Sequence, residues 1–343
     1  MKMRKAVAKR RKRASTGRSR RSRVVRWKDA IIRDYPRLIA LPNVERVAIG
    51  WKERKGQLTA RMAVKIYVAE KKAVLAKDQH LPKHAAVLLP IRPGIFRQRM
   101  LPTDVVWHAP ARFIVGPTDF LNPALSGAMI GIPGRQAGTL ACLVANTSGQ
   151  TFAITAAHVV QNLQGNVIPG IQVLQPPTST PGMPPGASPL FGRTAGGFFG
   201  LTPSGFADFA VLQLFGQRSA GTDALDGLQV QRQVLPSNVI INNRVPCSKF
   251  GAATGRTFGA FAASVPSMVV NGVTVTDVLE FIGLPGHVFA AEGDSGALVV
   301  SNMPNTTPFV IGILFAATPP APDAPAGRGF VIPFERVNGL RPV

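Results

Sequence analysis

The chain of 343 residues is long enough for two or three domains, and 45% of its residues are apolar, which supports a buried core. Its net charge of +23 is unevenly placed, because residues 1–26 hold 13 Lys or Arg and no acid, whereas residues 100–343 hold 11 basic and 11 acidic residues. Residues 100–343 therefore carry no excess positive charge that would indicate binding to a polyanion. No stretch reaches the roughly 20 apolar residues of a membrane-spanning helix, so no contact with a membrane is predicted.

Residues 1–26 form a basic arm that has almost nothing to bury. We expect this arm to be disordered, either as a solvated tail or as a phosphate-binding arm for nucleic acid or another polyanion. The arm lacks the apolar stretch of a signal peptide, and only two cysteines occur, Cys142 and Cys247. These features predict a reducing, cytoplasmic location, or a nuclear or organellar one in a eukaryote.

Residues 27–110 are predicted to form a small α+β leader domain. A short amphipathic helix is expected over residues 27–40, broken or kinked near Pro36. The stretch NVERVAIGWKERKGQLTARMAVKIYVAEKK predicts a hairpin that turns at ERKGQ. A helical piece, KKAVLAKDQ, and two strand-like pieces, AAVLLPI and TDVVWH, complete this domain.

The remainder divides into a Gly- and Pro-rich linker at 111–137 and a main module at 138–343. Short apolar segments separated by turn residues predict an all-β barrel or sandwich for this module. The predicted strands are GTLACLVAN, TFAITAAHVV, IQVLQ, ADFAVLQL, RVPCSKFG, TFGAFAASV, TVTDVLEFIG, SGALVV and FVIGILFA, and IPFERVNGL predicts a closing short helix.

The chain offers few groups for metal or cofactor chemistry. His80 and His84 are separated by Pro82 and have no further ligand near them, while His108 and His287 have no informative neighbours. Two thiols cannot supply a four-ligand zinc site alone. The sequence contains neither a P-loop nor a dinucleotide-binding glycine pattern, so no cofactor and no metal is predicted.

Three residues in apolar surroundings point to nucleophilic catalysis. His158 ends the predicted strand FAITAAHVV, and Asp208 lies inside the apolar segment FADFAVLQL, where it either faces water at an edge or is buried beside an imidazole. Ser295 lies in a Gly-Asp-Ser-Gly turn before an apolar run. A serine nucleophile needs a base, and that base needs a group that fixes its tautomer, so these three supply the parts of a triad. The backbone N–H groups of Gly293 and Ser295 are candidate oxyanion donors.

The segments TAAHVV, DFAVLQL and GDSGALVV, in the order His, Asp, Ser, resemble the trypsin/chymotrypsin-like serine peptidases of bacterial type. The resemblance covers about residues 138–340 and implies two six-stranded β-barrels with the site between them. His158 and Asp208 would belong to the first barrel and Ser295 to the second. The leader is also similar, more loosely, to a group of trypsin-like proteins that includes the plant narrow-leaf type.

The sequence departs from this family at three positions. Cys142 has no partner cysteine after His158, so we expect a free, buried thiol. Phe289 lies six residues before Ser295, where trypsins carry an acid, so cleavage after Lys or Arg is not supported. In zymogen-activated relatives the equivalent of Asp294 pairs with a newly cut N-terminus. Here it needs another partner, or the site is inactive as made.

Three functions remain open on the sequence alone. The first is a serine endopeptidase that acts on a protein or peptide substrate through an acyl-enzyme. The second is a catalytically silent, peptidase-like binding scaffold, which the basic arm could tether to nucleic acid. The third is a nucleic-acid-binding protein that carries the barrels as a passenger. The sequence predicts neither the oligomeric state nor the substrate.

Overall fold

The structure is a computed structural model that describes residues 29–343 apart from 55–56, 69–80, 93, 108–120, 122, 136, 178–187, 217, 225–226, 286–287, 305, 322–324 and 338. The side chains at positions 92, 107, 222 and 223 are also not described. Several predictions therefore lie outside the described residues. They concern the basic arm at 1–26, the helical piece at 71–79, and His80, His108 and His287.

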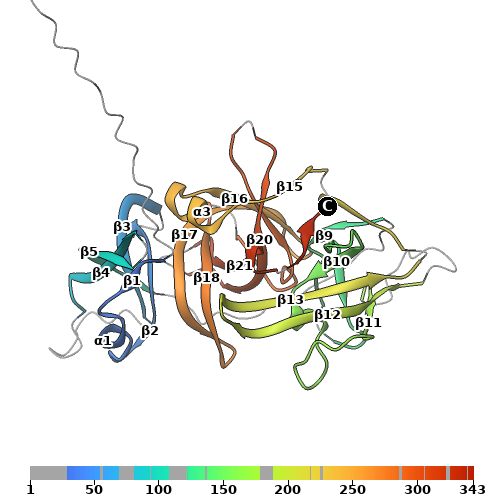
Figure 1. The fold of residues 1–343 in the computed structure, drawn as a ribbon, viewed down its shortest axis with the longest axis horizontal. Coiled ribbons are helices and arrows are strands. Elements are labelled where there is room, and N and C mark those ends of the chain that lie inside the picture. The colour runs from blue at the N-terminus through green and yellow to red at the C-terminus, as the bar shows by residue number, and fades with distance from the viewer. Residues whose placement is uncertain are drawn as a thin grey trace, which may run out of the picture.

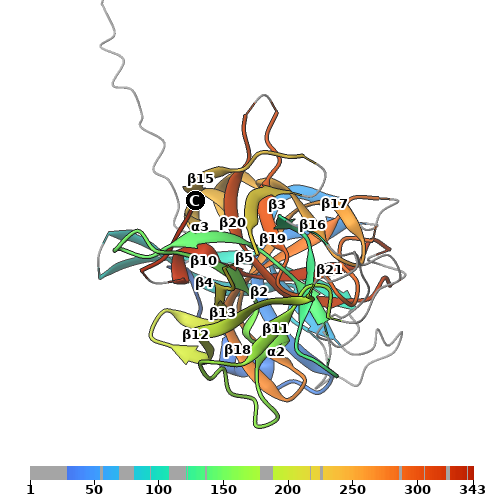
Figure 2. The same ribbon diagram turned by 90° about the vertical axis from the view of Figure 1, so that its right-hand side faces the viewer.

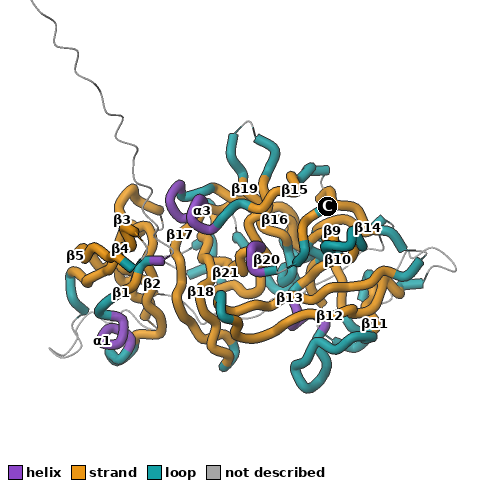
Figure 3. Tube along the Cα trace, viewed as in Figure 1, coloured by secondary structure: helices purple, strands orange, loops and turns teal. Residues whose placement is uncertain are grey.

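Strands dominate the described part of the chain, which confirms the all-β prediction (Figure 3). The strands are β1 (Ile31–Ile32), β2 (Val44–Arg54), β3 (Gln57–Val68), β4 (His84–Arg92), β5 (Ile95–Trp107), β6 (Ala124–Ser126), β7 (Met129–Gly131), β8 (Ala137–Thr139), β9 (Cys142–Ala145), β10 (Thr151–Thr155), β11 (Gln172–Leu174), β12 (Leu190–Thr202), β13 (Gly205–Leu214), β14 (Ala220–Ala224), β15 (Gln231–Val234), β16 (Pro246–Gly251), β17 (Gly255–Val270), β18 (Val273–Gly283), β19 (Leu298–Ser301), β20 (Phe309–Thr318), β21 (Arg328–Pro333) and β22 (Arg341–Pro342). The helices are short and are α1 (Tyr35–Ile39), α2 (Ala157–Val160), α3 (Ser237–Asn243) and the 3-10 helix η3 (Phe334–Arg336), which takes the place of the predicted closing helix.

Six strands in the second half of the chain close into a barrel. The hydrogen-bonded order is β17, β16, β19, β20, β21 and β18, and a further pairing between β17 and β18 completes the ring. Closure leaves no free edge within these six strands. This ring matches the second six-stranded barrel that the resemblance implied, and Figure 1 shows it in the middle of the molecule.

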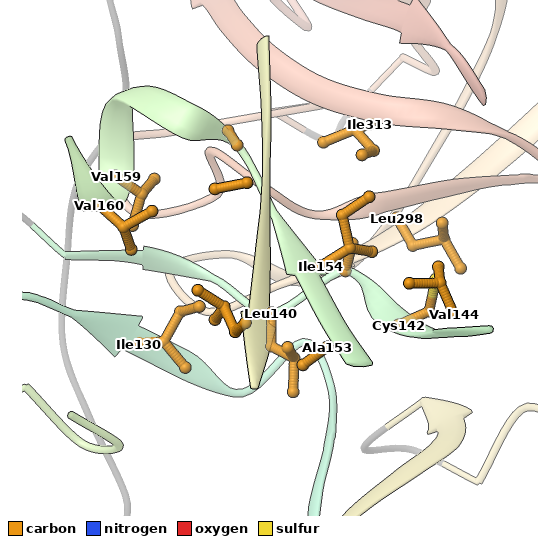
Figure 4. Close-up of a cluster of buried hydrophobic side chains, with 14 of the residues drawn as sticks. Ile130, Leu140, Cys142, Val144, Ala153, Ile154, Val159, Val160, Leu298 and Ile313 are labelled. Atoms are coloured by element: carbon orange, nitrogen blue, oxygen red, sulfur yellow. The ribbon is translucent and has the colours of Figure 1, made fainter. Parts of the chain in front are cut away.

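An eight-stranded sheet forms the other half of the main module, in the order β22, β9, β10, β13, β12, β11, β7 and β8. It packs on the ring through a shared core in which Ile154 and Cys142 lie near Leu298 and Ile313 (Figure 4). Cys142 is free and buried, as predicted, and its burial raises the pKa of its thiol to about 12.

The leader joins the ring as an extension of the same sheet. Its strands follow the order β1, β4, β5, β3 and β2, and β2 pairs with β17 by placing Gly50 opposite Ala263 and Ile49 opposite Ser264. A side chain at Gly50 would collide with the carbonyl oxygen of Ala262, so only glycine allows this approach. The leader lies at one end of the molecule in Figure 1, and Figure 2 shows the view along the long axis.

Two local predictions about the ends of elements are wrong. The helix predicted over residues 27–40 is confined to α1, since residues 31–32 form β1. Pro36 lies in the first turn of α1 and does not break it, because the fixed φ of proline suits that position and its missing N–H is not needed there. His158 does not end a strand, because β10 stops at Thr155 and the chain then turns into the short helix α2.

The predicted linker and strand set also need correction. The stretch 111–137 contains β6 and β7, and β7 pairs with both β8 and β11 around the buried Ile130, so the first sheet begins before residue 138. The long strand β12 was missed because four glycines (Gly192, Gly196, Gly197 and Gly200) weaken its strand signal. Without β12, strand β13 would lack a hydrogen-bonded neighbour on one side.

Candidate active site

Asp208 is fully buried in the middle of β13, which resolves the alternatives that the sequence left open. One carboxylate oxygen accepts the backbone N–H of His158 at 3.1 Å, and the other lies 2.6 Å from Nδ1 of the same histidine. A buried carboxylate needs such partners to remain charged. The contact favours a proton on Nδ1, so Nε2 is the nitrogen that can act as a base.

The strand register explains why these two residues meet. Antiparallel pairing places Thr155, the last residue of β10, opposite Ala210 of β13. The residues that follow Thr155 therefore run beside those that precede Ala210. The turn into α2 brings His158 back over β13, and the carboxylate of Asp208 lies beneath it.

Ser295 lies on a tight turn between the ring and the first sheet. Gly293 and Gly296 on either side of the turn have φ values of 101° and 94°, which side chains other than glycine rarely adopt. A side chain at Gly296 would also collide with the hydroxyl of Thr155, at the end of β10. The Oγ of Ser295 donates to the carbonyl oxygen of Phe315 at 3.4 Å.

The surroundings of Gly138 show that the serine turn and the histidine helix meet. A side chain at Gly138 would collide with both the side chain of Val159 and the carbonyl oxygen of Ser295. Val159 directly follows His158 in α2. The structure therefore brings His158, Asp208 and Ser295 into one neighbourhood, the first from α2, the second from β13 and the third from the loop before β19.

Thr139 anchors the serine turn from the first sheet, and sequence reasoning missed it. Its hydroxyl donates to the carbonyl oxygen of Gly293 at 2.5 Å, and its backbone N–H donates to the carbonyl oxygen of Ser295 at 2.6 Å. The same hydroxyl accepts the backbone N–H of Ala252 at 3.0 Å. Nothing in the segment AGTLAC marks this threonine, because its partners lie more than 100 residues away.

Asp294 has the partner that the sequence could not name. Its buried carboxylate lies 2.7 Å from Nζ of Lys249, which is buried on β16, and accepts the hydroxyl of Thr254 at 2.7 Å. Backbone N–H groups of Ala253, Thr254 and Ala291 complete the set at 3.0, 3.2 and 3.0 Å. Burial lowers the pKa of Lys249, and the negative charge of Asp294 opposes that effect. Asp294 is thus paired with a cation from within the same barrel.

Phe289 is buried inside the second barrel. Its ring stacks on Phe281 with centroids 6.4 Å apart, and a side chain at Gly329 would lie 2.5 Å from the ring. Its carbonyl oxygen accepts the hydroxyl of Thr257 at 2.6 Å. The position six residues before Ser295 is therefore apolar and packed, and it presents no charge for a Lys or Arg side chain.

Solvent has little access to the site. Ser295 and Asp208 are 0% exposed, and the side chain of His158 is 7% exposed.

Within the described ranges, no three His, Cys, Asp or Glu residues form a group that could hold a metal ion. No helix in the described part of the chain is long and apolar enough to cross a membrane.

Comparisons with known proteins give structural likenesses alone. No protein-family model matches the sequence, and no curated protein matches it. Solved structures similar to 64% of the chain include Thermobifida fusca Protease A (17% identity, TM-score 0.44), Nocardiopsis protease (18%, 0.43) and Cellulomonas bogoriensis chymotrypsin (19%, 0.44), of which 97%, 97% and 98% are covered. Likeness at this level carries no evidence of family or activity.

Proposed function

We propose that the chain is a serine endopeptidase that hydrolyses peptide bonds through Ser295, His158 and Asp208. The observation that carries the proposal is the buried carboxylate of Asp208, which is hydrogen-bonded to both the backbone N–H and the ring Nδ1 of His158. A carboxylate held in this way orients an imidazole and stabilises its protonated form, which is what a general base beside a serine requires.

The proposed reaction follows from these positions. Nε2 of His158 accepts the hydroxyl proton while Oγ of Ser295 attacks the carbonyl carbon of the substrate. The N–H groups of Gly293 and Ser295 would donate to the oxyanion of the tetrahedral intermediate. The imidazolium then gives its proton to the leaving amine, which leaves an acyl-enzyme. Water, activated by the same imidazole, releases the acyl group and restores the serine.

The ion pair between Asp294 and Lys249 supports a site that needs no cleavage for assembly. The residue beside the nucleophile is neutralised by a cation from the same barrel, at 2.7 Å, and by four further hydrogen bonds. The turn is also held by Thr139 from the first sheet. We therefore infer that the site is assembled without prior cleavage of the chain.

A fluorophosphonate probe, which forms a covalent bond with an activated serine, tests the proposal. We expect the parent to be labelled and Ser295→Ala to be unlabelled. Ser301→Ala is the matched control. It also removes a buried serine hydroxyl, in this case on β19, where the hydroxyl accepts the N–H of Phe309 at 2.9 Å. Labelling of Ser295→Ala at the parent's rate would refute the assignment of the nucleophile.

One observation favours a second candidate, a silent binding scaffold. Ser295 has no exposed surface, so a peptide bond can reach its hydroxyl only if neighbouring residues move. Labelling of the parent before and after limited proteolysis distinguishes the cases. A scaffold stays unlabelled under both conditions, whereas the proposed peptidase is labelled before any cut. Labelling only after a cut would overturn the inference that the site needs no cleavage.

A further inference from the structure

A cluster of buried charged side chains lies where the leader meets the second barrel. The leader supplies Arg46, Glu53 and Lys65, and the barrel supplies Glu280 on β18 and Arg328 on β21. None of these side chains is more than 7% exposed. Burying ions is costly, and well-packed apolar residues at such a position often give equal stability. The buried charged cluster is therefore better explained by the relative position of leader and barrel that it fixes than by added stability.

The strongest geometric constraint in this cluster joins Glu53 to Arg328. The two guanidinium Nη atoms donate to the two carboxylate oxygens of Glu53 at 3.0 and 2.7 Å, and one of them also donates to Glu280 at 2.7 Å. Two parallel bonds fix both the direction and the distance of the partners. Burial alone would raise the pKa of Glu53, but Lys65 and Arg328 hold it well below its usual range.

The leader holds Glu53 firmly in place. The ammonium of Lys65, on the neighbouring strand β3, contacts one carboxylate oxygen. The backbone N–H of Glu53 donates to Asp104 of β5 at 2.7 Å. Three residues before Glu53, Gly50 lies in the β2–β17 pairing that joins the leader to the ring. Glu53 is thus a fixed point rather than a mobile surface group.

Arg328 in turn lies on the strand pair that supports the nucleophile. It begins β21 and pairs with Thr318 of β20. Further along β20, the carbonyl oxygen of Phe315 accepts the hydroxyl of Ser295, and that of Leu314 accepts the next backbone N–H at 2.7 Å. A displacement of β21 would therefore be transmitted to the serine turn through β20.

A second route links the same strand to the loop that carries the serine. The carbonyl oxygen of Ala326, two residues before Arg328, accepts the backbone N–H of Phe289 at 2.8 Å. The close approach of Gly329 to the ring of Phe289 lies one residue after Arg328. Phe289 begins the loop that ends at Ser295. Arg328 therefore lies between two contacts that define this loop.

We propose that Glu53 is a positioning residue for the nucleophile, acting through Arg328 on the β20–β21 pair that supports Ser295. The inference rests on the proposed function, since it assigns the leader a part in the same reaction. It makes the leader a permanent component of the enzyme and not a removable segment.

The test measures labelling by the fluorophosphonate per mole of folded protein, together with kcat and KM on a peptide substrate. Glu53→Gln and Arg328→Lys should lower the labelling rate and kcat by about 3- to 30-fold, the range typical of coupling through another element, with little change in KM. Arg244→Met is the matched control. Arg244 also joins barrel to leader, through the carbonyl oxygen of Thr59 at 2.9 Å and the ring of Trp51, but does not touch Arg328.

The possible results separate the proposals. A purely structural role would lower the melting temperature of Glu53→Gln and leave its labelling rate per folded molecule at the parental value, which would overturn this inference alone. Equal slowing by Arg244→Met would overturn it as well, because general docking would then suffice. If Glu53→Gln and Arg328→Lys do not fold, Glu53→Asp, which keeps the charge on a shorter arm, decides between the same outcomes. A parent that stays unlabelled both before and after limited proteolysis overturns the proposed function and this inference together.

Discussion

Replacing Lys249 by methionine tests whether an internal cation holds the nucleophile turn. Lys249 and Asp294 are both fully buried, and Met keeps most of the volume of the side chain. Removal of one partner from a buried ion pair leaves an uncompensated charge and costs about 3–5 kcal/mol. Asp294 keeps four other hydrogen-bond donors, so we expect a loss near the lower end, about 3 kcal/mol. That is a large share of the ~5–15 kcal/mol that stabilises a typical domain.

The assay for Lys249→Met combines urea unfolding with labelling of Ser295 by the fluorophosphonate. We expect a lower urea midpoint and slower labelling, because the uncompensated carboxylate of Asp294 lies next to the nucleophile Ser295. The double variant Lys249→Met/Asp294→Asn removes both charges and should regain at least ~1 kcal/mol, as expected for residues in direct contact. The control is Lys52→Met, since Lys52 is 36% exposed and lies 3.6 Å from Asp104, an arrangement worth less than about 1 kcal/mol. A Lys249→Met protein with parental stability and parental labelling would refute the reasoning.

Four further predictions concern the candidate active site, the serine turn, the charged cluster between leader and barrel, and the basic arm. Asp208→Asn should lower kcat by ~10⁴-fold while the protein stays folded, because the amide favours the wrong tautomer of His158; a loss below tenfold would contradict this. Thr139→Val removes a buried hydroxyl that makes two hydrogen bonds and should cost about 2–3 kcal/mol in urea unfolding, whereas a loss under 0.5 kcal/mol would show that the turn does not depend on it. The pKa of Glu53 is lower in the folded protein than its ordinary value of 4.5, so its contribution to stability is present above that pH and is lost as the pH falls below it. Urea midpoints between pH 6 and pH 3 should therefore fall less in Glu53→Gln than in the parent, and equal slopes would argue against this assignment. Deletion of residues 1–26 should abolish salt-sensitive DNA or RNA binding, measured by fluorescence anisotropy, without changing the labelling rate; retained binding would place the site elsewhere.

The three residues of the candidate site could be selected from the sequence because each has a local signal. Ser295 lies in a turn whose glycines have positive φ, and His158 follows an apolar strand. Asp208 is an acid inside an apolar strand, which requires a buried partner, and the imidazole is that partner. The secondary structure around the site was predicted less accurately, since α2 and β12 were missed. A single helical turn and a Gly-rich strand carry almost no periodic signal.

The contacts that support the site could not be predicted in the same way because they join distant parts of the chain. Thr139 meets Gly293 across 154 positions, and Glu53 meets Arg328 across 275. Residue type and neighbours say nothing about such pairs. The pairing of β2 with β17, and of β20 with β21, places Glu53 within reach of Arg328, and the contact between the first sheet and the loop before β19 brings Thr139 to Gly293.

Even so, part of the signal was present in the sequence. Lys65 in AVKIYV, Lys249 in PCSKFG and Glu280 in VLEFIG each interrupt an apolar strand, as Asp208 does. Side chains alternate along a strand, so Lys249 shares a face with the buried Cys247, and its charge requires a buried acid. Strand pattern therefore predicts that such residues are paired, although it cannot choose among the acids. The choice depends on topology, because the pairing of β16 with β19 is what brings Lys249 to Asp294.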